Sequence, residues 1–120
     1  MKNESLQEPL VNYVRVHRTT AGLSQREVGL VLGYDDHEAV AQHERFRSLP
    51  PLLIALGYEV MFQVPVSEIF AGLRHVMKQN IEERLTDFET ELRNREVQGF
   101  RRKAQERKLQ WLEDRRAETK

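Results

Sequence analysis

Cysteine is absent from this 120-residue chain, and its 19 basic and 19 acidic residues leave no formal net charge. Without cysteine there is no disulfide framework, no thiolate metal ligand and no thiol nucleophile. No apolar run is long enough to cross a bilayer. The polar start MKNESLQEP lacks the apolar segment of a signal peptide. These absences indicate a cytoplasmic protein without a membrane partner.

Patterns of catalytic and metal-binding residues are missing as well. None of the four histidines has the partner spacing of a zinc-binding helix. The chain has no glycine-rich phosphate loop and no serine in a nucleophile elbow. We therefore expect no enzyme, no metal site and no cofactor. His17 and His43 are interpreted as helix-face residues.

Strand patterns are also lacking, because no segment alternates apolar and polar residues as a half-buried strand does. Charged residues make up 32% of the chain, which is typical of long solvated helices. The predicted fold class is therefore all-α. A chain of 120 residues has room for one domain and one extended element.

The clearest helix signal begins at Ser24. Its hydroxyl and the carboxylate of Glu27, three residues later, have the spacing of a capping box. Gly33 ends this helix, since glycine adopts the left-handed C′ conformation without steric cost. Asp35 and Glu38 repeat the capping-box spacing, which predicts the next helix over about 36–45. Two helices joined by a tight, glycine-containing turn are the helix-turn-helix unit, whose second helix lies in the DNA major groove.

Three further short helices are predicted around this pair. They cover about 9–21, 51–62 and 65–70, and each begins at or near a proline, which is tolerated in a first helical turn. Gly57 is interpreted as a position of close helix packing. The residues expected to face the core of the three central helices are Val28, Val31, Leu32, Ala39, Val40, Leu53, Leu56 and Val60.

The pattern changes from residue 73 onward, where apolar residues form a narrow stripe on a long helix: Leu73, Met77, Ile81, Leu85, Phe88 and Leu92. A closed domain before the stripe leaves too little surface to cover it, and an exposed apolar seam indicates a partner. We expect a domain over 1–72 and a long C-terminal helical extension over 73–120. Gly99 interrupts the pattern, and beyond residue 93 we expect a bend, a change of partner or fraying.

Three segments resemble one family: GLSQREVGLVLGY, HERFRSLP and IALGYEVMFQVPVSEIF are similar to the λ-repressor/Cro-like (XRE) helix-turn-helix regulators. The resemblance covers about 10–73 and implies a five-helix DNA-binding domain acting in the bacterial cytoplasm or nucleoid. It further implies that Gln25 reaches a DNA phosphate and that Glu44 pairs with an arginine to brace the motif. Phe46 stands where many members have glycine, and we interpret it as a core or partner contact.

The residues expected to read base edges begin the helix over 36–45: Asp36, His37, Glu38 and Gln42. Members of the family more often have small hydroxyl and basic residues there. The acidic residues are also explained by capping and by interaction with the helix dipole. Functionally, a carboxylate accepts a hydrogen bond from cytosine, and glutamine pairs with adenine.

Basic residues are unevenly distributed. Up to residue 65 there are six basic and eight acidic residues, so phosphate binding depends on local placement of charge. The candidate phosphate contacts are Arg15, Arg18, Arg26, Arg45 and Arg47. The basic run over 93–108 is either the solvated face of a helix or a second contact with DNA, RNA or an acidic protein.

These patterns favour a sequence-specific DNA-binding transcriptional regulator. We expect double-stranded DNA as its ligand, and a homodimer or a second protein bound through the C-terminal helix. A dimer would bind an inverted-repeat operator with its two recognition helices about one DNA turn apart. The alternative is a protein-interaction module, or an antitoxin-like adaptor, in which the helix-turn-helix scaffold binds DNA weakly or not at all.

Overall fold

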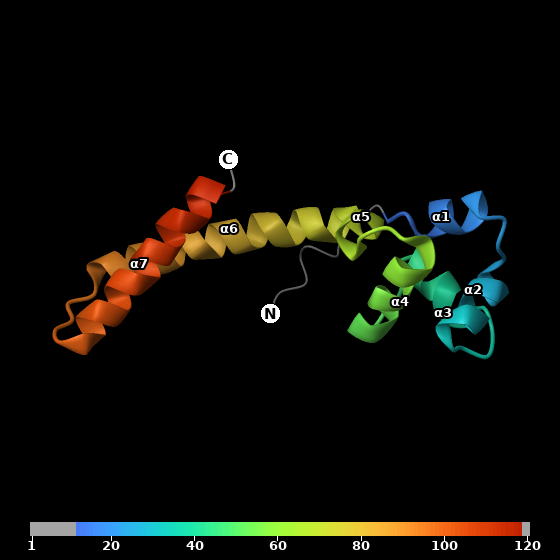
Figure 1. Cartoon of the computed structure of the whole chain (residues 1–120), viewed down its shortest axis with the longest axis horizontal. Helices are drawn as coiled ribbons and strands as arrows, with labels where there is room; N and C mark the ends of the chain where they lie inside the picture. The colour runs from blue at the N-terminus through green and yellow to red at the C-terminus, as the bar shows by residue number, and fades with distance from the viewer. Residues whose placement is uncertain (1–11, 119–120) are drawn as a thin grey trace. The chain divides into compact units, whose positions relative to one another are not determined.

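The computed structural model describes residues 12–118, and all regular secondary structure within them is helical, as predicted (Figure 1). The helices are α1 (Val14–Thr20), α2 (Gln25–Leu32), α3 (Glu38–Glu44), α4 (Leu52–Phe62), α5 (Val66–Ile69), α6 (Ala71–Asn94) and α7 (Phe100–Glu118). The described chain divides into two compact units between Met77 and Lys78, within α6. The division falls five residues after the predicted domain boundary at residue 72.

The first unit is held together by one small apolar core. Each of the five helices before α6 contributes one fully buried side chain, and the residue after α5 adds another: Val14, Val28, Val40, Tyr58, Ile69 and Phe70. Helices of 4 to 11 residues are unstable alone, because too few hydrogen bonds offset the cost of nucleation. The shared core is therefore what makes these helices stable.

The predicted start and end of α2 are both confirmed. The Ser24 hydroxyl accepts a hydrogen bond from the Glu27 N–H at 3.0 Å, and the Glu27 carboxylate accepts one from the Ser24 N–H at 2.8 Å. These bonds lower the pKa of Glu27. At the other end, Gly33 has φ +99°, and the Tyr34 N–H donates to the carbonyl of Gly29 at 2.8 Å. This is the Schellman geometry that a C′ glycine favours.

Two glycines permit close packing of α2. A Cβ built at Gly29 would lie 2.3 Å from the backbone carbonyl oxygen of Asp36, so the turn before α3 rests directly on α2. A Cβ at Gly57 would lie 2.8 Å from Cδ2 of Leu32, which confirms the close packing predicted at Gly57.

In two places a side chain that accepts a backbone hydrogen bond keeps residues before a helix out of it, although these residues were predicted to be helical. Helix α3 begins at Glu38 rather than at Asp36, because the Asp36 carboxylate accepts a hydrogen bond from the Glu38 N–H at 2.9 Å, which holds residues 35–37 in a turn. Helix α1 begins at Val14, whose N–H donates to the side chain of Asn12 at 3.2 Å. The first residues of the predicted helix over 9–21 lie outside the described residues.

The predicted inward face of α4 is also wrong. Leu53, Leu56 and Val60 are 79%, 42% and 77% exposed, and Val31 on α2 is 69% exposed. Helix α4 is apolar on every side, so periodicity cannot distinguish its inner face from its outer face. The face that packs inward contains Ile54, Ala55, Tyr58, Met61 and Phe62.

Phe46 follows α3 in the left-handed conformation, with φ +57°, a backbone region that favours glycine. Its half-buried ring packs against the core and meets the ring of Phe70 edge-on, with the centroids 6.4 Å apart. The predicted core contact is confirmed. Burial of the ring offsets a backbone conformation that costs about 1–2 kcal/mol for a residue with a Cβ.

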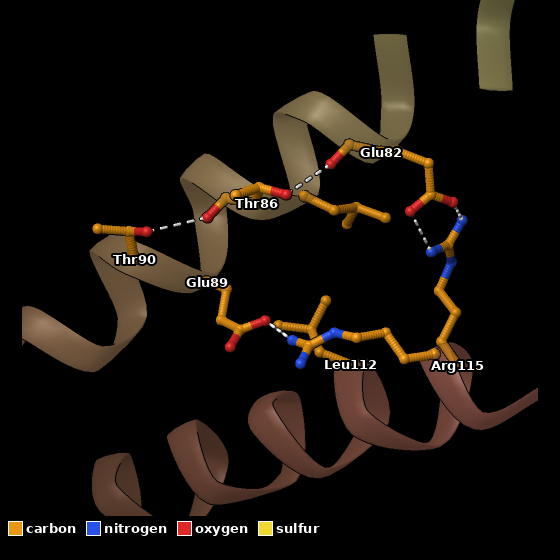
Figure 2. Close-up of a pocket in the computed structure, with 8 residues that line it drawn as sticks. Glu82, Thr86, Glu89, Thr90, Leu112 and Arg115 are labelled. Carbon is orange, nitrogen blue, oxygen red and sulfur yellow. Dashed lines mark hydrogen bonds and ion pairs between the residues drawn. The ribbon is translucent and has the colours of Figure 1, made fainter. Parts of the chain in front are cut away.

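The second unit is a helical hairpin rather than one long helix. The chain turns after α6, with Gly99 at φ +67°, and α7 returns along α6. Figure 2 shows Glu82 on α6 bound to Arg115 on α7 through hydrogen bonds of 2.6 and 3.1 Å. These bonds lower the pKa of Glu82. Leu92 and Leu112 are buried in this unit, and Gln105 donates to the carbonyl of Leu92.

Part of the predicted apolar stripe of α6 is therefore covered. Leu73 packs against the core of the first unit, and Leu92 is only 1% exposed. Leu85 and Phe88 are half-buried, whereas Met77 and Ile81 are 45% and 38% exposed. The expectation of an uncovered seam is wrong at Leu73 and Leu92, because α7 and the first unit supply the missing cover.

Replacement of Gly29 by alanine should destabilise the first unit by about 2 kcal/mol, because overpacking against a backbone carbonyl costs more than the helix propensity of alanine returns. Gly57→Ala is the matched control. Its new methyl group meets only the end of the flexible Leu32 side chain, so we expect a change within about 1 kcal/mol. Urea unfolding followed by far-UV circular dichroism measures both values. Equal losses in the two variants would contradict the backbone contact.

Replacement of Phe46 separates its packing from its backbone strain. Phe46→Ala should cost about 2 kcal/mol, because it removes the ring and keeps a Cβ at positive φ. Phe46→Gly loses the same contacts but relieves the strain, so it should be about 1 kcal/mol more stable than the alanine variant and still less stable than the original chain. Urea unfolding of the three proteins tests this order. A glycine variant more stable than the original chain would mean that the ring contributes little.

Candidate nucleic-acid interface

A buried ion pair ties the ends of three helices together. The Arg18 guanidinium on α1 donates to both oxygens of Glu44 at the end of α3, at 2.6 and 3.2 Å, and to the carbonyl of Leu23 at 3.0 Å. The Gln25 side chain at the start of α2 donates to Glu44 at 3.1 Å. The Arg18 and Glu44 side chains are only 13% and 5% exposed. The pairing of Glu44 with an arginine is thus confirmed, and it raises the pKa of Arg18.

This pairing determines which side chains remain available to a ligand. The expectation that Arg18 binds a DNA phosphate is wrong, since its guanidinium is buried against Glu44 and Leu23. Gln25 is half-buried and its side-chain amide donates to Glu44, so the side chain is already engaged in the absence of DNA. The contact of Gln25 with a phosphate stays a prediction.

The start of α3 presents the predicted base-reading residues together on the surface. Asp36, His37 and Glu38 are exposed, and Gln42 is half-buried one turn later. The Gln42 amide donates to the Glu38 carboxylate at 3.0 Å, and the same carboxylate lies 3.9 Å from Nε2 of His37. The surface of α3 is therefore acidic at its start, with polar side chains that contact one another.

Cations gather at the opposite end of α3. Arg26, Arg45 and Arg47 are exposed, and within residues 12–118 none of them forms an ion pair. The Gln25–Glu44 hydrogen bond brings the start of α2 and the end of α3 into contact. Arg26 and Arg45 each lie one residue from this bond. We call these three arginines the arginine cluster.

His43 has a role in the core that the sequence did not reveal. It lies on the inner face of α3 and is 3% exposed, and its Nδ1 lies 2.8 Å from the Tyr58 hydroxyl. Its carbonyl accepts a hydrogen bond from the Asn12 side chain at 3.2 Å. Burial lowers the pKa of His43 and raises that of Tyr58. Its spacing of three residues from the buried Val40 was the signal that could have placed it on the inner face.

Other kinds of site find no support within the described part of the chain. Residues 12–118 contain no group of three or more histidines and carboxylates placed to bind a metal ion. None of their helices combines the length and the apolar character needed to span a membrane. No family model, curated protein or solved structure matches this chain.

The buried His43 should make the first unit less stable in acid. Above about pH 6.5 the side chain is neutral in both the folded and the unfolded state. Below this value the unfolded chain binds a proton that the folded state resists, so the free energy of unfolding falls by up to about 1.4 kcal/mol per pH unit until the folded pKa is reached. Urea unfolding across this pH range measures the decline.

The matched pair for this test is His43→Gln and His37→Gln. Glutamine at position 43 can still meet the Tyr58 hydroxyl but does not titrate, so the decline attributable to this residue should disappear. His37 is exposed, and its replacement should leave the decline in place. Parallel curves for the original chain and His43→Gln would show that the buried imidazole is not responsible.

Proposed function

We propose that this chain is a DNA-binding transcriptional regulator of the cytoplasm or nucleoid, and that its first unit has the λ-repressor/Cro-like arrangement of helices. One observation carries the proposal. Helix α3 is fixed to α1 and α2 by the Arg18–Glu44 pair and by the contact of Gly29 with the Asp36 carbonyl, while residues 36–38 at its start are exposed and Gln42 is half-buried. A short helix held rigidly with a free outer surface is suited to the DNA major groove.

The arginine cluster supplies the charge that such a role needs. Exposed arginines without an acidic partner are available to DNA phosphates, and phosphate contacts provide most of the non-specific affinity. The capping box pairs the N–H groups of Ser24 and Glu27, and the positive end of the helix dipole at the start of α2 also favours a phosphate near Arg26. The net charge of the chain is zero, so binding relies on this local arrangement rather than on overall attraction.

Base recognition is assigned to the start of α3. Gln42 can exchange its bond with Glu38 for a bidentate pair with adenine, and an exposed carboxylate can accept a hydrogen bond from the amino group of cytosine. The ring N–H of His37 can donate to an acceptor on a base edge. A homodimer would place two such surfaces on an inverted repeat. In this proposal Met77 and Ile81 remain candidates for contact with a second copy or another protein.

A second function is favoured by the exposed carboxylates of Asp35, Asp36 and Glu38. They would be repelled by phosphates unless the arginine cluster compensates for them. If it does not, the same surface would suit a basic protein partner, and the chain would be an interaction module or antitoxin-like adaptor. Measurement of DNA binding at low salt decides between the two functions, since phosphate contacts are strongest there.

Replacement of Arg26, Arg45 and Arg47 by glutamine should weaken binding to every DNA duplex. If each arginine neutralises one phosphate, the slope of log affinity against log salt becomes shallower by about 2.7. Fluorescence anisotropy over a range of salt concentrations measures the slope. Arg84→Gln, which removes an exposed arginine from α6, should leave it unchanged.

Gln42→Ala should instead weaken binding to the preferred sequence selectively, by about 1–3 kcal/mol. The preferred sequence comes from selection of bound duplexes out of a random pool, where an inverted repeat should be enriched. Negligible binding of all duplexes at low salt would refute the regulator and leave the interaction module.

A further inference from the structure

The proposed function leaves an apolar groove in the first unit without a role. It lies between α2 and α4, has a volume of about 390 Å³, and is lined only by aliphatic side chains, one methionine and one glycine: Val31, Leu32, Leu53, Leu56, Gly57, Val60 and Met61. No charged or hydrogen-bonding side chain contributes to its lining. Such a surface has little to offer a phosphate or a polar ligand.

The outer face of α4 continues this groove. Leu52, Leu53, Leu56 and Val60 fall within about 100° of the helix circumference at 3.6 residues per turn. They are between 42% and 79% exposed. The only charged residue of α4 is Glu59, and its carboxylate accepts a hydrogen bond from the Val66 N–H at 2.8 Å. Helices that are apolar all round are normally buried on all sides, so the outer face of α4 requires a cover.

The groove and the ridge beside it are complementary to each other. Leu53, Leu56 and Val60 follow the spacing of three and four residues that forms a ridge on a packing helix. Gly57 has no side chain, so Leu32 of α2 packs closely against it and both form part of the groove lining next to this ridge. Because ridge and groove lie on the same surface, two copies related by a two-fold axis can each insert the ridge into the other's groove. This is the condition for an isologous interface.

We infer that this surface is the interface of a homodimer, in which α4 of one copy packs against α4 of the other. The exposed parts of Val31, Leu52, Leu53, Leu56 and Val60 amount to roughly 450 Å² of aliphatic area per copy. A standard interface buries about 800 Å² per partner, rather more than half of it apolar. The patch therefore supplies most of the apolar centre of a small dimer interface.

The chemistry of the patch favours a second copy over another partner. An apolar surface without charges cannot select an oppositely charged protein or a nucleic acid by electrostatic complementarity. The inference extends the proposed function, because an inverted-repeat operator requires a two-fold dimer. It places the dimer contact on α4 and not on the apolar stripe of the C-terminal helix. Self-association can also be measured without DNA.

Sedimentation velocity of the full chain, at total concentrations from about 1 to 200 µM, tests the interface in the range expected for a small one. The original chain should convert from monomer to dimer. The variant Leu53→Glu with Val60→Glu would bury carboxylates at the interface, so its dimer should be at least about 100-fold weaker. Both side chains are largely exposed, so circular dichroism and the thermal midpoint should change little.

A milder variant, Leu53→Gln with Val60→Thr, should weaken the dimer to an intermediate degree if the charged variant does not fold. Met77→Glu with Ile81→Glu, on exposed apolar residues of α6, tests the competing site of self-association, and this α6 control should dimerise as the original chain does. A monomeric original chain, a groove variant that still dimerises, or loss of the dimer only in the α6 control would each refute the inference. DNA binding retained by a monomeric groove variant would leave the proposed function standing.

Discussion

The buried pair of Arg18 and Glu44 is the constraint on which the first unit depends. It joins α1 to the end of α3, and Gln25 extends it to the start of α2. Buried charges are costly to desolvate, and removing one partner would leave the other uncompensated. Here the guanidinium donates to two carboxylate oxygens and a backbone carbonyl. This satisfied network fixes the orientation of α3 more than it adds net stability.

The same network determines which charged side chains near α3 remain exposed. Because Glu44 is occupied by Arg18 and Gln25, the neighbouring Arg45 has no acidic partner within the described residues and remains exposed. The acidic start of α3 lies at the other end of the helix. A basic end and an acidic start on one short helix constrain the orientation in which a charged partner can approach it.

Helix α4 shows that a small domain cannot bury every apolar surface of its helices. Its inner face completes the core around Tyr58, whose hydroxyl meets the buried His43. Its outer face is equally apolar, and none of the described residues of the first unit covers it. A domain of this size has a high ratio of surface to volume and cannot bury both faces of every helix. In the second unit, by contrast, α6 and α7 cover part of each other's apolar surface through Leu92 and Leu112.

The sequence alone determined the helical class, both ends of α2, the turn at Gly33 and the break near Gly99. Each of these depends on a few adjacent residues whose local hydrogen bonds or backbone freedom leave little choice. It also anticipated the arginine partner of Glu44 through family resemblance.

Only the tertiary structure decided which face of α4 is inside, that His43 is buried and Arg18 unavailable, and that α7 returns along α6. These outcomes depend on which of several apolar or charged surfaces meet after folding. Periodicity cannot decide that when a helix is apolar on both faces, or when a covering helix lies beyond a turn.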